Sequence, residues 1–213
     1  MEIQIKGTII PNDDKDIYEF FGYENTCPND VVNALENAGN DKIDIYINSG
    51  GGDIFSATEI YSAIQKHKDN VKIHVVGLAA SAASVIMCAA ENDISTTSMV
   101  MIHNVSTIAQ GDFKDFKHES ETLRKADRAM CQAYVDKSGK SENDFLPLMD
   151  KETWFTAQEA VDIGLCDKVV GRDVLINGYC SFVTDEQRKQ FENAKAKAKA
   201  QIRLEKLKGD VKI

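Results

Sequence analysis

The segment from Val71 to Ala90 constrains the fold of this chain more than any other. It begins with a β-branched run that ends at Gly77, continues through a turn of small residues that carries Ser81, and passes into an apolar helix pattern from Ala82. A strand, turn and helix in this order predict an α/β domain. They also place one hydroxyl at the N-terminus of a buried helix, where free N–H groups favour the negative charge that a nucleophilic serine develops. Serine is also a preferred helix cap, so capping is the alternative role for Ser81.

The bulk composition describes an acidic globular protein. The 213 residues include 25 basic and 34 acidic side chains, which give a formal net charge of −9, and 43% of the residues are hydrophobic. This balance argues against general binding to nucleic acid or to an anionic membrane. No stretch approaches the ~18 consecutive apolar residues of a membrane span, and the first residues lack the regions of a signal peptide. We therefore expect a cytoplasmic protein that binds neither nucleic acid nor a membrane.

The cysteines predict neither a disulfide framework nor a zinc site. Their number is odd, their spacing is wide, and no pair has the Cys-x-x-Cys spacing. A reducing cytoplasm is the natural setting for such thiols. We expect no metal and no cofactor. The cysteines are Cys27, Cys88, Cys131, Cys166 and Cys180.

Strand patterns alternate with helix patterns along most of the chain, which predicts an α/β domain with parallel strands. Residues 12–28 lack a clear period and are predicted to form a loop, and Asn29 is the predicted cap of the helix that follows. Strands are predicted at 3–10, 43–47, 71–76, 94, 99–102 and 168–170, and helices at 30–36, 54–66, 113–135, 142–148 and 156–163.

The C-terminal residues differ in composition from the rest. We divide the chain into a domain of residues 1–183 and a basic helical tail of residues 184–213. Thr184 and Gln187 have the spacing of a capping box, and lysine alternates with alanine over residues 194–200. This tail is either a solvated helix or a docking arm for an acidic partner.

A glycine run follows the predicted strand 43–47. In the sequence Asn48-Ser-Gly-Gly-Gly52-Asp53, the glycines let the backbone adopt positive φ and approach a ligand closely. The exposed N–H groups can hold an oxyanion or a phosphate. The spacing is neither that of a P-loop nor that of a dinucleotide-binding turn.

A histidine and two acids complete the candidate catalytic residues. His103 follows the apolar strand pattern 99–102, which is the half-buried position that a general base for Ser81 needs. The alternative is an ordinary histidine at a strand end. Asp150 or Glu152 can orient such a histidine, although both can be plain loop charges, and spacing does not choose between them.

Four segments in order resemble the proteolytic subunit of the Clp protease, over roughly residues 3–170. The resemblance is closest to the Clp-like proteases that phages and prophages encode for head maturation. It implies the Clp protease/crotonase-like α/β fold, with repeated β-β-α units, a protruding handle helix at about 112–136 and a C-terminal helical tail. The segments are Ile47–Gly52, Gly77–Ser81, Met101–His103 and Phe155–Asp167.

The resemblance also implies roles for individual residues. Ser81 is the nucleophile and His103 the general base, and the backbone N–H groups of Gly52 and Ala82 form the oxyanion hole. The mechanism implied is peptide hydrolysis through an acyl-enzyme.

The chain departs from the family pattern at two places. Glu152 occupies the position of the family's third catalytic residue, an aspartate, and Asp150 remains a rival. Ala83 and Ser84 stand where the family has Gly-Ala. Ser84 lies one helical turn beyond Ser81 and is not expected to replace it as the nucleophile.

The function implied is that of a serine endopeptidase in a homo-oligomeric ring, hexameric or heptameric and possibly stacked through the handle helices. Its substrate would be a peptide or unfolded protein, such as a phage scaffold or capsid protein. The short segment before the first strand argues against an ATPase unfoldase partner. The alternatives are a catalytically weak or inactive structural ring protein and a crotonase-like acyl-thioester enzyme. Ser81 and His103 together favour hydrolysis, because crotonase chemistry needs no such pair.

Overall fold

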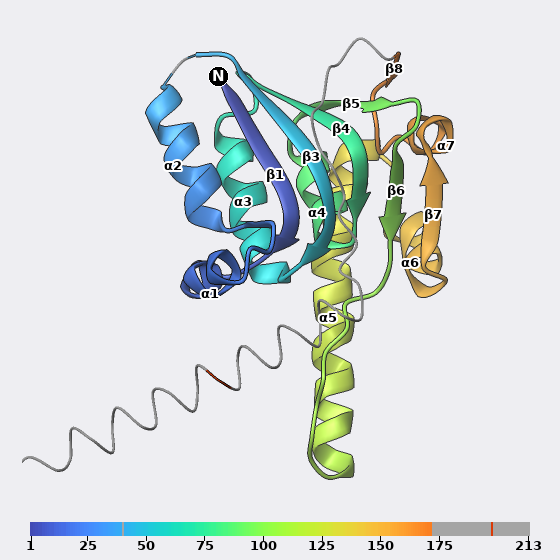
Figure 1. Ribbon diagram of the computed structural model, residues 1–213. Helices are drawn as coiled ribbons and strands as arrows, with labels where there is room; N and C mark the ends of the chain where they lie inside the picture. The colour runs from blue at the N-terminus through green and yellow to red at the C-terminus, as the bar shows by residue number, and fades with distance from the viewer. Residues whose placement is uncertain (40, 172–196, 198–213) are drawn as a thin grey trace, which may run out of the picture. The chain divides into compact units, whose positions relative to one another are not determined.

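An eight-stranded sheet organises residues 1–39, 41–171 and 197, the part of the chain that this computed structural model describes (Figure 1). Its main path runs β2-β1-β3-β4-β5-β8 with parallel neighbours, and β6 pairs in parallel with β4 and antiparallel with β7. The predicted parallel α/β architecture is confirmed, and it fits the Clp protease/crotonase-like fold. The strands are β1 Glu2–Ile9, β2 Asn25–Thr26, β3 Ile43–Gly52, β4 Val71–Ala80, β5 Glu91–Ser95, β6 Met99–Ile102, β7 Thr153–Thr156 and β8 Val169–Val170.

Helices α2, α3 and α4 cover one face of the central strands (Figure 1). The alternation along β3 explains why, since Ile43, Ile45 and Ile47 are buried under these helices while Asp44 and Tyr46 point to the opposite face. The helices are α1 Lys15–Phe20, α2 Pro28–Ala38, α3 Ile54–Lys66, α4 Ala82–Ile86, α5 Phe113–Ser138, α6 Glu142–Asp150 and α7 Ala157–Asp162, with short 3₁₀ turns η1 at Asn12–Asp14 and η2 at Met87–Ala89.

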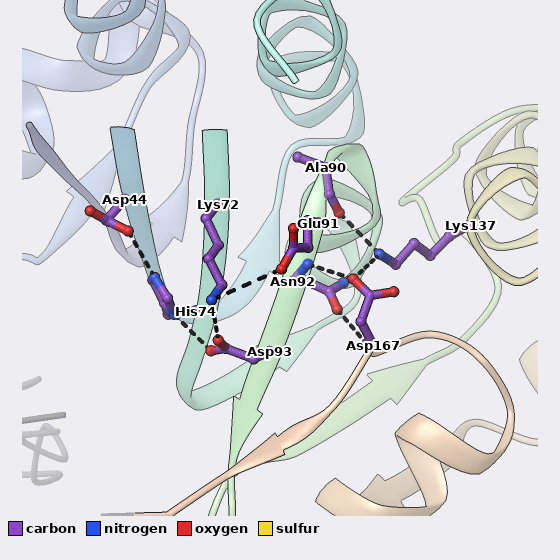
Figure 2. Close-up of polar contacts among 9 residues, drawn as sticks. All are labelled: Asp44, Lys72, His74, Ala90, Glu91, Asn92, Asp93, Lys137 and Asp167. Carbon is purple, nitrogen blue, oxygen red and sulfur yellow. Dashed lines mark hydrogen bonds and ion pairs between the residues drawn. The ribbon is translucent and has the colours of Figure 1, made fainter. Parts of the chain in front are cut away.

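Polar side chains cross-link the strands on the opposite face of the sheet (Figure 2). His74 Nδ1 lies 2.7 Å from Asp93 Oδ1, and His74 Nε2 lies 3.1 Å from Asp44 Oδ1. Lys72 Nζ lies 3.1 Å from Asp93 Oδ2, and the ring of Tyr46 stacks on the imidazole. These contacts join β3, β4 and β5, because the strand register places Tyr46, His74 and Asp93 side by side. His74 has no acidic neighbour in sequence, so its partners emerge only from strand pairing.

A second polar cluster anchors the C-terminal end of α5 (Figure 2). Lys137 Nζ lies 2.7 Å from Asp167 Oδ2 and donates to the carbonyl of Ala90 at 3.1 Å. Asp167 also accepts from the N–H of Asn92 at 2.7 Å and donates its own N–H to the Asn92 side chain at 3.0 Å. Helix α5 is thereby fixed to β5 and to the segment that precedes β8.

The two ends of α5 have different surroundings. The C-terminal third contributes Met130 and Tyr134 to the core, whereas Phe113 and Phe116 near its start are 76% and 51% exposed. In Figure 1 the N-terminal half projects beyond the sheet. Asp112 caps the helix through the N–H groups of the first turn, and Gly139 ends it in the left-handed conformation. The predicted handle helix at about 112–136 corresponds to this element.

Two details of the predicted secondary structure are wrong. Residues 12–28 form η1, α1 and β2 rather than a loop, and the cap of α2 is Cys27, not Asn29. The Cys27 N–H donates to Asp30, whose carboxylate also pairs with Lys15 of α1. These contacts order a segment whose own sequence shows no period.

The predicted tail, residues 184–213, lies outside the described residues apart from Lys197, which is helical and exposed. In the described part of the chain, no helix has the length and apolar character needed to cross a membrane. Over the same residues, no cluster of histidine, cysteine and carboxylate side chains is arranged to hold a metal ion. The thiols of Cys27, Cys88, Cys131 and Cys166 are buried and free.

Candidate active site

Ser81 lies in the sharp turn between β4 and α4. Its backbone has φ 54° and ψ −125°, a left-handed conformation that a residue with a side chain rarely adopts. The Ser81 side chain makes no capping hydrogen bond to α4. Its Oγ instead lies 2.8 Å from Nε2 of His103. The capping role is therefore wrong, and the hydroxyl faces a base as nucleophilic chemistry requires.

The pairing of β6 with β4 brings His103 to this turn. Ala80 lies opposite Met101 in the register, and the N–H of Ser81 donates to the carbonyl of Met101 at 2.9 Å. His103 follows two residues later and is half-buried. Because both strands are parallel and end at the same edge of the sheet, their next residues meet there.

The loop that follows His103 is fixed by two acids. Asn104 Nδ2 donates to Asp150 Oδ1 at 2.8 Å, and the N–H of Val105 donates to Asp127 Oδ1 at 2.7 Å. Burial raises the pKa of Asp127 above its usual range, against the opposing effect of the Val105 N–H. Asp127 lies on α5, so a hydrogen bond joins this helix directly to the loop that follows His103.

Neither of the two acids predicted as the third catalytic residue is hydrogen bonded to His103. Glu152 Oε1 accepts from Trp154 Nε1 at 3.3 Å, and its backbone has a positive φ of 50°. Asp150 is engaged by Asn104. Over residues 1–39 and 41–171, no hydrogen bond joins the second ring nitrogen of His103 to a carboxylate. The structure brings Ser81 and His103 together and leaves the two candidate acids on other partners.

The glycine run packs against the Ser81 turn. Gly51 and Gly52 have φ values of 93° and 149°. A Cβ at Gly51 would lie 2.7 Å from the Ala80 carbonyl oxygen and 2.9 Å from the Ala82 nitrogen, so only glycine permits this approach. Gly52 and Ala82 line the same cavity as Ser81 and His103.

That cavity has a volume of about 170 Å³, and its wall presents polar and apolar groups in similar measure. Met130 and Tyr134 reach it from α5, and neither carries a motif that predicts such a role. The only sequence signal is their place on the buried face of an amphipathic helix. Ile54, Val85 and Val105 also line the cavity with apolar side chains.

A hydroxyl directed at an imidazole can attack a carbonyl group, and backbone N–H groups beside it can stabilise the resulting oxyanion. Comparison with known proteins gives a consistent result. The Clp protease family matches residues 24–173. Among curated proteins, the ATP-dependent Clp protease proteolytic subunit of Bacteroides fragilis is 34% identical over 131 residues, 60% of this chain and 63% of the relative.

A second relative is proteolytic subunit 1 of the same protease from Protochlamydia amoebophila. It is 34% identical over 129 residues, 58% of this chain and 63% of the relative. The chain thus spans a little under two thirds of the length of these relatives. Since the family match covers well over half of its residues, the chain belongs to the Clp protease family.

Proposed function

We propose that this protein is a serine-type endopeptidase that hydrolyses peptide bonds through an acyl-enzyme. The single observation that carries the proposal is the 2.8 Å separation of Ser81 Oγ and His103 Nε2 in the wall of a cavity that both residues line. The names of the relatives, proteolytic subunits of a Clp protease, support the same chemistry.

In this mechanism His103 accepts the proton of the Ser81 hydroxyl as Oγ attacks the carbonyl carbon of the scissile bond. The N–H groups of Gly52 and Ala82 hold the oxyanion of the tetrahedral intermediate. His103 then protonates the departing amine, and a water molecule activated by the same imidazole hydrolyses the ester. Removing one such N–H donor costs about 100- to 1000-fold in rate in other serine hydrolases.

We assign the third catalytic role to Glu152, with Asp150 as the rival. Glutamate serves in this position in some serine hydrolases. As placed, Glu152 is hydrogen bonded to Trp154, so in this role it would exchange that contact for the imidazole of His103. Asp150 would in the same way have to leave Asn104.

The working form is proposed to be a homo-oligomeric ring that admits peptides or unfolded chains. The projecting half of α5, with Phe113 and Phe116 exposed, supports a role for this helix in contacts between subunits. Ring size, stacking, a prophage origin, independence of an ATPase, a scaffold or capsid substrate and a cytoplasmic location stay predictions.

Labelling with a fluorophosphonate probe, read by intact mass, tests the proposal on the full chain. We expect one adduct on the wild type and none on Ser81→Ala or His103→Ala, provided that both variants fold as judged by circular dichroism. A folded, assembled wild type without an adduct would overturn the proposal and favour a structural ring protein. Binding of an acyl-coenzyme A without an adduct would favour crotonase-like chemistry.

A further inference from the structure

Two buried hydroxyl groups connect α5 to the backbone of the nucleophile. Ser84 Oγ lies 2.6 Å from the carbonyl oxygen of Ser81, and the hydroxyl of Tyr134 lies 2.7 Å from Ser84 Oγ. Ser84 is fully buried and Tyr134 is 1% exposed. A carbonyl oxygen can only accept, so the Ser84 hydroxyl donates to Ser81 and the Tyr134 hydroxyl donates to Ser84. Burial raises the pKa of the Tyr134 phenol, which keeps it a donor at neutral pH.

The carbonyl that accepts this hydrogen bond belongs to Ser81, whose backbone conformation is strained. A non-glycine residue at φ 54° is energetically unfavourable, and it persists only where surrounding contacts hold it in place. The carbonyl of Ser81 accepts from both the N–H and the hydroxyl of Ser84, at 2.9 and 2.6 Å. The N–H of Ser81 donates to the carbonyl of Met101. Ser84 therefore supplies two of the contacts that fix the turn.

Ser84 and Tyr134 depend on each other. A hydroxyl without partners is costly at a fully buried position such as that of Ser84. The hydroxyl of Tyr134, 50 residues later in the chain, donates a hydrogen bond to the Ser84 oxygen and so gives it a second partner. The pair thus forms one buried chain of hydrogen bonds that runs from α5 to the carbonyl of Ser81.

We propose that Ser84 and Tyr134 are positioning residues, through which α5 holds the backbone of Ser81 in the conformation that directs its hydroxyl to His103. This inference rests on the proposed hydrolase function. Neither residue takes part in bond making, and each acts through the carbonyl of Ser81.

The test compares Ser84→Ala, Tyr134→Phe and the double variant with the wild type. Fluorophosphonate acylation rates and peptidase kinetics are measured beside thermal unfolding. Tyr61→Phe is the matched control, because Tyr61 also carries a hydrogen-bonded hydroxyl, to Gln65, but on α3 and away from the cavity. Phenylalanine at 134 keeps the ring that lines the cavity, so substrate binding is expected to persist.

We expect each single variant to lower kcat and the acylation rate about tenfold with KM little changed, and Tyr61→Phe to lower neither. The double variant is expected to lose about tenfold, not a hundredfold, because both residues act through one chain of hydrogen bonds. Its melting temperature should recover relative to Ser84→Ala, since no buried hydroxyl is left unpaired.

A double variant that recovers its melting temperature but not its acylation rate would show that the two residues position Ser81 and do not only stabilise the fold. A double variant that regains both the melting temperature and the wild-type rate would overturn the inference, and so would single variants that acylate as fast as the wild type. These results leave the proposed function intact. A wild type that forms no adduct would overturn the proposed function and the positioning role with it.

Discussion

His103 Nε2 lies 2.8 Å from Ser81 Oγ, although 22 positions separate the two residues in the chain. Strand pairing produces this contact, because β6 lies beside β4 in parallel and both strands end at the same edge of the sheet. Ser81, the proposed nucleophile, has a backbone conformation that is unfavourable for serine, and the surrounding hydrogen bonds hold it there. The proposed reactivity of Ser81 would therefore depend on contacts along the whole sheet edge, which also includes the glycine run.

The first prediction concerns Gly51. A methyl group at this position would lie 2.7 Å from the Ala80 carbonyl oxygen and 2.8 Å from Ser81 Cβ, on a backbone with φ 93°. We expect Gly51→Ala to lower the acylation rate by about 100-fold or more, because the clash displaces the turn and the N–H groups beside it. The cost to the free energy of unfolding is expected to be about 1–3 kcal/mol.

Gly50 provides the matched control for this experiment. A Cβ at Gly50 meets no atom within 4 Å, so Gly50→Ala is expected to fold and react as the wild type does. Fluorophosphonate acylation and urea unfolding are measured for both variants. Equal rates for the two would contradict the close approach of the glycine run to the nucleophile.

The second prediction concerns the third catalytic residue. We expect Glu152→Gln to lower kcat by about 100-fold or more, because an uncharged amide cannot stabilise the imidazolium of His103. Asp150→Asn is expected to lower kcat only a few-fold, through the loss of its contact with Asn104. The variants are compared by peptidase kinetics at matched folding. The opposite order of effects would reassign the role to Asp150.

The sequence predicts the nucleophile and the base because both belong to the ends of apolar strands. Ser81 follows a β-branched run, and His103 follows the apolar strand of residues 99–102. The local sequence pattern therefore predicts the strands that precede Ser81 and His103. Parallel pairing of these strands then places both residues at the same edge of the sheet. The choice between Glu152 and Asp150 as the third catalytic residue cannot be predicted from the sequence in the same way. The direction of the Glu152 and Asp150 side chains depends on the particular partners Trp154 and Asn104, which no periodicity encodes.

Other features depend on contacts between distant positions. The segment of residues 12–28 is ordered by pairing of Thr8 with Asn25 and by the ion pair between Lys15 and Asp30. Strand β7 has only four residues and exists through antiparallel pairing with β6. Tyr134 enters the cavity because α5 packs there. These elements have weak local signals, and tertiary contacts decide them.

The third prediction concerns the thiols. Burial raises the pKa of Cys131 to about 11 and that of Cys166 to about 12. Burial also raises the pKa of Cys88 and Cys27. Since the thiolate is the reactive form, we expect these four thiols to resist iodoacetamide at about pH 8 and to react once urea unfolds the chain. The experiment uses Cys180→Ser, because Cys180 lies outside the described residues. Rapid alkylation of any of the four in the native protein would contradict their burial.

The fourth prediction concerns the pH dependence of stability at the start of α2. Burial alone would raise the pKa of Asp30, but the Lys15 ammonium and the Cys27 N–H outweigh it and hold that pKa below its usual range. The unfolded chain therefore binds the proton first as the pH falls. The stability from this carboxylate is present above its unfolded-state pKa of about 3.9 and is lost as the pH falls through the lower folded-state value.

We therefore expect Asp30→Asn to reduce the free energy of unfolding by roughly 0.5–1 kcal/mol at neutral pH, a small value because the carboxylate and its lysine partner are partly exposed. The difference from the wild type should shrink through the acid range. Urea unfolding over a pH series measures it, with Asp16→Asn, an exposed residue of the adjacent α1, as the control. If the difference in the free energy of unfolding stays constant to the acid end of the series, the charge of Asp30 does not account for its stabilisation of α2.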